Sequence, residues 1–156
     1  MAEKTNAMRK LASMKIEFKE HYYAETGAIA GADVARALGE DPKRVFKTLV
    51  TVGKTGAHYV FLVPVEEELN LKKAAAAVGE KSVEMIKSKE LLPLTGYIHG
   101  GCSPIGMKKL FPTFIDETAI LFDKICVSGG RIGTNLGLNP EKLAAFINAQ
   151  FVDLTK

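Results

Sequence analysis

The sequence predicts an α+β domain in which helices flank a mixed β-sheet that can curl into a barrel-like form. Three observations lead to this prediction. Helical and strand patterns alternate irregularly, two neighbouring strand patterns are almost wholly apolar, and no linker or internal repeat divides the 156 residues. Elements of both kinds packed around one core are typical of this class. We therefore expect residues 1–156 to form a single domain.

The first third of the chain carries two helical patterns with a strand pattern between them. Apolar residues at helical spacing predict an opening helix over residues 5–15, and alternation then predicts a strand over 16–23. A second short helix is expected over 32–38, because Gly39 follows it at the usual C-terminal position. The pair Asp41-Pro42 is typical of an N-cap with proline at the first helical position, which opens a single turn.

The middle of the chain predicts a hairpin followed by a helix. Residues 45–52 are rich in β-branched side chains and residues 59–65 are almost wholly apolar, with the turn-forming residues 53–56 between them. Nearly continuous apolar character is typical of strands that are covered on both faces. The alanine-rich segment 69–78 predicts a helix that ends at Gly79.

The second half of the chain carries shorter patterns. A further helical turn is predicted over residues 82–89, and Asn139-Pro140-Glu141 caps a final helix with an apolar face of Leu143, Phe146 and Ile147. Short strands separated by glycine or proline are expected over residues 96–101, 114–116, 119–123 and 124–128.

Composition restricts the class of protein without naming a function. The net charge of +3 permits phosphate binding but does not require it. No apolar run reaches the roughly 20 residues of a membrane span, and the N-terminus lacks an apolar signal core. Cys102 and Cys126 form no disulfide framework, and His21, His58 and His99 fall on different elements without metal-site spacing. We expect a cytoplasmic protein with reduced thiols, no metal and no other cofactor.

Lys47 is the first candidate functional residue. In a strand it shares a face with Val45 and Leu49, and a lysine among apolar neighbours is costly unless its ammonium meets water or an anion. Two interpretations stay open. Lys47 extends to solvent at a sheet edge, or it contacts a phosphate or carbonyl group at the mouth of a pocket.

Two glycine-rich loops are the other candidates. Residues 96–109 hold three glycines and a proline within seven positions, so backbone amides can approach a ligand closely. Residues 127–135 form a second such loop, which offers a hydroxyl, an amide and a cation. Neither matches a phosphate-binding or dinucleotide-binding pattern. Cys102 lies in the first loop, but no Cys–His–Asn order, paired carboxylates or Ser–His–Asp order accompanies it. The sequence is thus poor in classical catalytic groups.

Taken together, these segments resemble the YbaK/EbsC family in order and spacing, from His21 to Phe151. The matching segments are Val45-Phe46-Lys47-Thr48-Leu49, Leu69-Asn70-Leu71-Lys72-Lys73, Gly96-Tyr97, Gly100-Gly101-Cys102-Ser103-Pro104-Ile105-Gly106-Met107-Lys108-Lys109, and Val127-Ser128-Gly129-Gly130. The resemblance implies a mixed β-barrel flanked by helices, related to the editing insertion of bacterial prolyl-tRNA synthetases.

The resemblance also implies an activity. It implies an aminoacyl-tRNA deacylase that removes cysteine from tRNA(Pro), with prolyl-tRNA synthetase as a partner. In this branch the cysteinyl thiol attacks its own ester carbonyl, so the protein needs only to orient the thiol and stabilise the oxyanion with backbone N–H groups. Two alternatives stay open: a deacylase for another small amino acid such as alanine, and a non-catalytic adaptor that binds tRNA or a synthetase.

The resemblance assigns roles to individual positions. Catalytic roles fall on Lys47, which is expected to hold a phosphate or the acceptor end of the tRNA, and on the loop residues Gly100 and Gly101. Expected substrate-binding residues are Tyr23, Thr48, Asn70, Ser128 and Asn135.

The chain departs from the family pattern after Ser128. The family usually carries Lys-Arg and then an acidic residue there, where this chain has Arg131-Ile132 and Asn135. An amide in place of a carboxylate removes a negative charge. The departure therefore bears on how the amino group of the substrate is bound and on which amino acid is removed.

Overall fold

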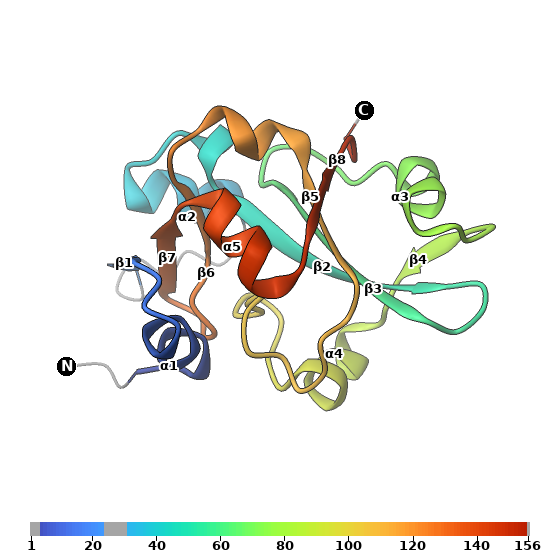
Figure 1. The fold of residues 1–156 in the computed structure, drawn as a ribbon, viewed down its shortest axis with the longest axis horizontal. Coiled ribbons are helices and arrows are strands. Elements are labelled where there is room, and N and C mark those ends of the chain that lie inside the picture. Colours follow the sequence, from blue (N-terminus) through green and yellow to red (C-terminus); the bar gives the residue numbers. More distant parts are fainter. Residues whose placement is uncertain (1–3, 24–30, 156) are drawn as a thin grey trace.

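The computed structural model describes residues 4–23 and 31–155, and these form two β-sheets with helices around them (Figure 1). One sheet has the strand order β1-β7-β6 and the other β4-β2-β3-β5-β8. The elements are α1 (Asn6–Ser13), β1 (Lys19–Tyr22), α2 (Gly31–Leu38), η2 (Pro42–Arg44), β2 (Phe46–Gly53), β3 (His58–Pro64), α3 (Leu71–Val78), β4 (Val83–Met85), α4 (Ser88–Thr95), β5 (Thr113–Asp116), η3 (Glu117–Leu121), β6 (Ile125–Ser128), β7 (Thr134–Leu138), α5 (Pro140–Ile147) and β8 (Gln150–Val152).

The expected α+β class is confirmed, whereas the barrel is not closed. β3, β5 and β8 run parallel to one another, while β2 pairs antiparallel with both β3 and β4, so the larger sheet is mixed. The smaller sheet is wholly antiparallel. Within the described residues, backbone pairing joins the two sheets at one isolated bridge, between Val45 and Cys126. No helix in that part of the chain is long and apolar enough to cross a membrane.

Capping residues set the helix ends where the sequence predicts them. Thr5 Oγ1 accepts a hydrogen bond from Met8 N at 3.2 Å and begins α1. Asp41 caps the 3-10 turn η2, and Asn139 Oδ1 accepts from Lys142 N at 3.0 Å to begin α5. Gly39, in the left-handed region at φ 69°, ends α2.

The β2–β3 hairpin is covered on both faces, as its apolar sequence predicts. On one face Phe46, Val50 and Leu62 belong to the main core, which lies between the two sheets and includes residues of α1 and α5. On the other face Phe61 and Val63 pack under α3 in a second core. Fully burying one such side chain stabilises the fold by about 1.5–3 kcal/mol.

Several predicted elements of the second half are wrong. Residues 82–89 are not helical throughout: Val83–Met85 is strand β4, and helix α4 begins at Ser88. Residues 96–101 form a loop, and most of 119–123 lies in the 3-10 turn η3. Strands β7 and β8 were not predicted. β4 and β8 form because distant strands offer them backbone hydrogen bonds, which local sequence does not reveal.

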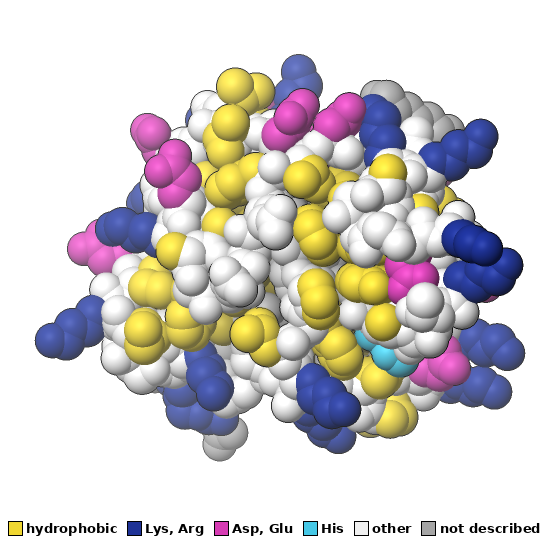
Figure 2. Space-filling view, turned by 45° about the vertical axis from the view of Figure 1, so that its right-hand side comes forward, with side chains coloured by type: hydrophobic (Ala, Val, Ile, Leu, Met, Phe, Trp, Pro, Cys, Tyr) yellow, Lys and Arg dark blue, Asp and Glu magenta, His cyan; other side chains and the backbone are white. Residues whose placement is uncertain are grey.

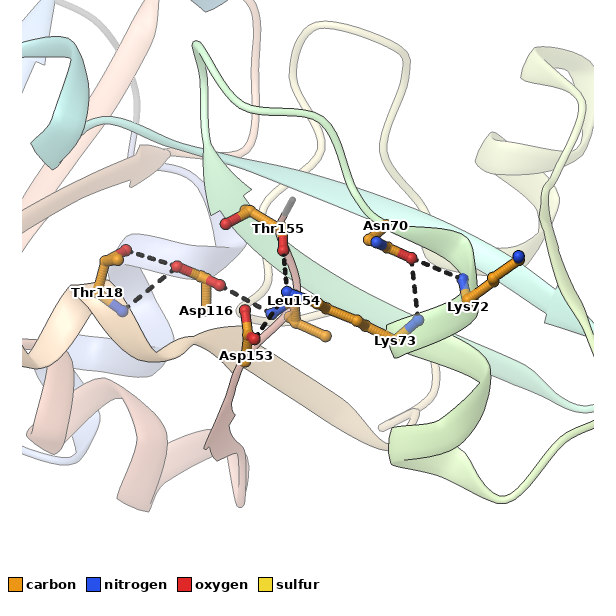
Figure 3. A network of polar contacts seen from close by, with 8 residues as sticks. All are labelled: Asn70, Lys72, Lys73, Asp116, Thr118, Asp153, Leu154 and Thr155. Carbon is orange, nitrogen blue, oxygen red and sulfur yellow. Dashed lines mark hydrogen bonds and ion pairs between the residues drawn. The ribbon is translucent and has the colours of Figure 1, made fainter.

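A polar network fixes the segment that follows β8 (Figure 3). The buried Asp116 carboxylate accepts hydrogen bonds from Leu154 N at 2.9 Å and from Thr118 Oγ1 at 2.6 Å. Lys73 Nζ contacts the Asp153 carboxylate at 2.7 Å and donates to the carbonyl of Thr155. The segment therefore joins the end of β5 to α3.

Candidate active site

The outer edge of β2 has strand partners at its two ends but not between them. Val45 bridges to Cys126 just before the strand, while Thr51–Gly53 pairs with β4 and Val50 O accepts from Ile86 N at 3.2 Å. In the described chain, residues 46–49 have no strand partner on this edge. A cavity of about 330 Å³ opens there, between the two sheets and α4.

The walls of the cavity are apolar, with a few polar groups pointing inward. Apolar lining is common in small-molecule sites, where a small number of polar groups fix orientation. The lining residues are Tyr23, Val45, Phe46, Lys47, Thr48, Leu49, Val50, Val65, Met85, Ile86, Lys87, Ser88, Leu91, His99, Gly100, Cys102, Ser128 and Asn135.

Lys47 is half-buried in the wall formed by β2. Burial lowers the pKa of its ammonium, and the nearby carboxylates of Glu68 and Glu67 oppose this shift. Among the described residues, ion pairs join Lys4 to Glu20 and Lys73 to Asp153, and none includes Lys47. A partly desolvated cation gains most from an anionic ligand, so Lys47 is placed to contact one.

Two buried polar groups at the cavity lack an internal partner. Among the described residues, Thr48 Oγ1 and Asn135 Oδ1 are buried without a hydrogen bond. Asn135 is 4% exposed and lies opposite Ser128 across β6 and β7. Native proteins pair nearly all buried polar groups. Two unpaired atoms on the wall of one cavity therefore indicate that a ligand supplies the partners.

The two glycine loops touch each other beside the cavity. Gly100 lines it with a φ of 86°, which a residue with a side chain rarely adopts. A Cβ atom on Gly101 would lie 2.8 Å from the backbone of Arg131 and Ile132. Gly101 does not itself line the cavity. Its missing side chain lets the loop 96–109 approach the loop that carries Ser128 and Asn135.

Hydrogen bonds hold the first glycine loop in place. The Tyr97 hydroxyl donates to the carbonyl of Ile105, and burial raises the pKa of Tyr97 to about 12. Ser103 Oγ accepts from Ile105 N at 3.2 Å. Asn6 Nδ2, at the start of α1, donates to Gly106 O at 2.8 Å. These contacts give the loop a fixed backbone, as preorganised N–H donors require.

The cavity offers no activated nucleophile among the described lining residues. Burial raises the pKa of the Cys102 thiol to about 12, so this thiol is protonated at neutral pH. Ser128 Oγ accepts a hydrogen bond from Gly130 N at 3.3 Å. His99 lines the cavity but is mostly exposed.

The structure brings most of the predicted site residues together. Tyr23, Lys47, Thr48, Gly100, Ser128 and Asn135 all line the cavity. Tyr23 is 4% exposed, and burial raises its pKa.

Asn70 is elsewhere in the molecule. Its Oδ1 accepts hydrogen bonds from Lys72 N at 3.0 Å and Lys73 N at 3.1 Å, and it begins α3 as an N-cap.

Sequence reasoning missed part of the lining. The pairing of β4 with β2 brings a further segment to the cavity, namely Met85, Ile86, Lys87 and Ser88. The local sequence does not predict this pairing. His99 could have been found, because it precedes Gly100 in the glycine loop.

Comparison with known proteins finds relatives whose descriptions all concern the charging or editing of tRNA. Residues 26–146 match the sequence profile of the aminoacyl-tRNA editing domain family. EbsC of Enterococcus faecalis, described as a candidate Cys-tRNA(Pro)/Cys-tRNA(Cys) deacylase, is 46% identical over 154 residues, which cover 98% of this chain and 94% of EbsC. A proline–tRNA ligase of Thermosipho melanesiensis is 32% identical over 98 residues, which are 63% of this chain and 17% of the ligase.

A solved structure shares the fold along nearly the whole chain. The crystal structure of a candidate trans-editing enzyme for prolyl-tRNA synthetase superposes with a TM-score of 0.83 at 26% identity, and the match covers 99% of both chains.

Proposed function

Since the chain belongs to the aminoacyl-tRNA editing domain family and is a trans-editing deacylase of mischarged tRNA, we propose that its substrate is cysteine esterified to tRNA(Pro). One observation carries the choice of cysteine: the cavity combines unpaired polar groups with the absence of an activated nucleophile among its described lining residues. Such a site binds and orients a substrate that carries its own nucleophile.

The reaction needs one attack within the substrate. The cysteinyl sulfur forms a bond to the ester carbonyl carbon, and the bond from that carbon to the terminal ribose oxygen breaks. The thiol proton passes to the ribose oxygen, so the tRNA leaves with a free hydroxyl and cysteine leaves as a thiolactone. Charge develops on the carbonyl oxygen during the attack, and the backbone N–H of Gly100, which lines the cavity, stabilises it in this proposal. Gly101 supports the loop instead, because its N–H donates to Ile98 O at 3.0 Å.

The remaining groups position the two ends of the substrate. Lys47 holds a phosphate or the acceptor end of the tRNA, because its partly desolvated ammonium faces the cavity. The amide of Asn135 and the hydroxyls of Thr48 and Ser128 surround the amino acid. About 330 Å³ accommodates a small aminoacyl group with its ribose and excludes a duplex.

We place this reaction in the cytosol, with prolyl-tRNA synthetase as the partner that selects tRNA(Pro). Both cysteines are free, which fits a reducing compartment. The relatives include a proline–tRNA ligase and a candidate trans-editing enzyme for prolyl-tRNA synthetase.

A deacylation panel tests the substrate. Cys-, Ala-, Ser- and Pro-tRNA(Pro) are incubated with the protein, with and without prolyl-tRNA synthetase, and the release of amino acid is timed. We expect Cys-tRNA(Pro) to react fastest. Replacing sulfur by oxygen in Ser-tRNA(Pro) should slow release on the order of 10²-fold or more, because the weaker nucleophile is no longer assisted. Faster release of alanine than of cysteine would replace the proposed substrate.

The variant Lys47→Ala tests the site. We expect its kcat/KM for Cys-tRNA(Pro) to fall on the order of 10²-fold or more, because a preorganised charge is lost. Lys54→Ala, in the exposed turn of the same hairpin, is the matched control and should keep full activity. Circular dichroism checks that both variants fold. An unchanged rate in Lys47→Ala would remove this lysine from the mechanism.

A further inference from the structure

One face of the three-stranded sheet continues past the cavity to a second cluster of reactive side chains. The strand register sets His21 opposite Asn135, Ser128 opposite Asn135, and Cys126 opposite Gly137. Since side chains alternate along a strand, His21 and Cys126 point to the same face as the cavity residues Asn135 and Ser128. The imidazole and the thiol belong to the two outer strands of this sheet.

The glycine of the central strand lets these two groups approach. A Cβ atom on Gly137 would lie 3.3 Å from Nε2 of His21. The imidazole therefore occupies the space that a side chain at position 137 would need. It lies over β7 and reaches towards Cys126, which is 5% exposed.

A carboxylate completes the cluster from a third element. Gly39 ends α2 with a φ of 69°, its N–H donates to Arg36 O, and Glu40 N donates to Ala35 O, each at 3.1 Å. This pair of bonds is a Schellman motif, which fixes the residue that follows the helix. Glu40 is half-buried beside the sheet as a result.

We propose that His21, Glu40 and Cys126 bind a divalent transition-metal ion, with Zn²⁺ as the preferred ion. One nitrogen, one carboxylate oxygen and one sulfur from these residues lie within 4.8 Å of one another. Histidine, cysteine and carboxylate are the ligands that zinc takes in proteins, at about 2.0–2.3 Å, and three protein ligands leave a fourth position for water. Small side-chain rotations would bring the three atoms to tetrahedral spacing.

The charges around the cluster suit an occupied site. Burial lowers the pKa of His21, and the Glu40 carboxylate opposes this shift, while Lys19 and Lys124 lower the pKa further. A lowered pKa favours the neutral imidazole, which is the form that binds a metal ion. Zn²⁺ with the Glu40 carboxylate and a Cys126 thiolate has no net charge, so the neighbouring cations are not repelled. Burial raises the pKa of the free Cys126 thiol to about 12, and Glu40 adds to the shift while Arg44 opposes it. Because the thiolate is the form that binds a metal ion, metal binding must release the thiol proton.

The site would connect α2 to the wall of the cavity. Cys126 bridges to Val45, which lines the cavity, and His21 pairs with Asn135. An ion held by β1, β6 and the end of α2 would cross-link these segments. This inference stands on the cluster alone and does not depend on the identity of the substrate.

Cobalt titration tests the site, because Co²⁺ takes the place of Zn²⁺ and gives visible absorption when a thiolate coordinates it. We expect the metal-free protein to bind one Co²⁺ with a thiolate-to-cobalt band, and Zn²⁺ to displace it. The band should disappear in Cys126→Ser and persist in Cys102→Ser. Affinity should fall at least 10-fold in His21→Ala and Glu40→Gln but not in His58→Ala.

Two further readouts cover variants that fail to fold. Zn²⁺ at about a hundred times its dissociation constant should raise the Tm of the wild-type protein by about 5 °C or more. X-ray absorption of the zinc form should show one sulfur at about 2.3 Å with lighter nitrogen and oxygen ligands. Failure of the wild-type protein to bind Co²⁺ or Zn²⁺, a band that survives in Cys126→Ser, or coordination without sulfur would each overturn the proposal.

Discussion

Thr48 and Thr51 lie three residues apart on β2, and their hydroxyl groups have opposite surroundings. Thr51 Oγ1 donates to Tyr59 O at 3.0 Å inside the hairpin. Thr48 Oγ1 is buried at the cavity and has no partner in the described part of the chain. A buried hydroxyl with no internal partner costs free energy in the unliganded protein. Thr51 therefore stabilises the fold, whereas the hydroxyl of Thr48 is placed to bind a ligand.

Thr48→Val removes the hydroxyl and keeps the shape of the side chain. We expect urea unfolding to show no loss of stability, because no internal hydrogen bond is broken. The kcat/KM for Cys-tRNA(Pro) should fall about 10-fold, the equivalent of about one hydrogen bond to the substrate. Thr51→Val is the matched control and should show the reverse: a loss of about 1 kcal/mol of stability with an unchanged rate. Equal effects of the two variants would contradict a ligand-binding role for Thr48.

Gly101→Ala tests the contact between the two glycine loops. The added methyl group would overlap the backbone of Arg131 and Ile132, so we expect a loss of about 1–3 kcal/mol in the free energy of unfolding. The displaced loop also carries Ser128 and Asn135, so deacylation should slow. Gly56→Ala, at a φ of 92° in open space, should cost about 1–2 kcal/mol without slowing the reaction. Full activity of Gly101→Ala would show that the loops need not touch.

At the scale of single residues, the sequence could predict kinds of group but not their partners. A lysine in an apolar strand left two interpretations open for Lys47, and only the unpaired edge of β2 shows that a cavity lies beside it. The resemblance picked out Gly101 as a functional position. Its contact with Arg131 depends on two loops distant in sequence, so it could not be predicted.

At the scale of elements, Asn70 shows how a segment that resembles a family pattern can be explained by the start of a helix. Its side chain accepts two backbone N–H groups at the start of α3 and does not line the cavity. We expect Asn70→Ala to lose about 1 kcal/mol in urea unfolding, the usual effect of removing an N-cap. Asn70→Asp, which keeps the cap, should retain the stability. Neither should change kcat/KM, and a large loss of rate in both would restore the predicted substrate contact.

Local pattern predicts elements well where capping and periodicity act within the element. The hairpin of β2 and β3 and the helices α1, α3 and α5 were predictable for this reason. β4 was not, because Val83–Met85 becomes a strand through pairing with Thr51–Gly53. β7 was not predictable either, because Gly137 interrupts the short apolar pattern of Thr134–Leu138. The pairings that the sequence does not reveal are also those that bring Lys87 and Asn135 to the cavity.

At the scale of the whole molecule, the positive charges are few in excess and dispersed over the surface. The net charge is +3, and Figure 2 shows Lys and Arg side chains dispersed around the rim of one face with hydrophobic side chains in its middle. Among the described residues that line the cavity, the lysines are Lys47 and Lys87. A broad electrostatic footprint for RNA is therefore not expected on this face.

Salt dependence measures how many phosphates the protein contacts. If Lys47 and Lys87 each meet one phosphate of the single-stranded acceptor end, the slope of log K against log salt should be about −1.4. Filter binding of a non-hydrolysable Cys-tRNA(Pro) analogue between about 50 and about 200 mM salt gives this slope. Lys47→Ala should reduce its magnitude by about 0.7. A slope steeper than about −4 would mean that a larger basic surface takes part.

The strand order also decides when each part of the fold can assemble during synthesis on the ribosome. β1 finds its partner only when β7 has emerged, and β8 joins the larger sheet after every other strand. The β2–β3 hairpin, by contrast, can form early from neighbouring residues. An early strand that waits unpaired is exposed to wrong pairing. β1 is short and begins with the polar residues Lys19, Glu20 and His21. Short, polar strands are poor templates for wrong pairing, so we expect an unpaired β1 to aggregate little before β7 emerges.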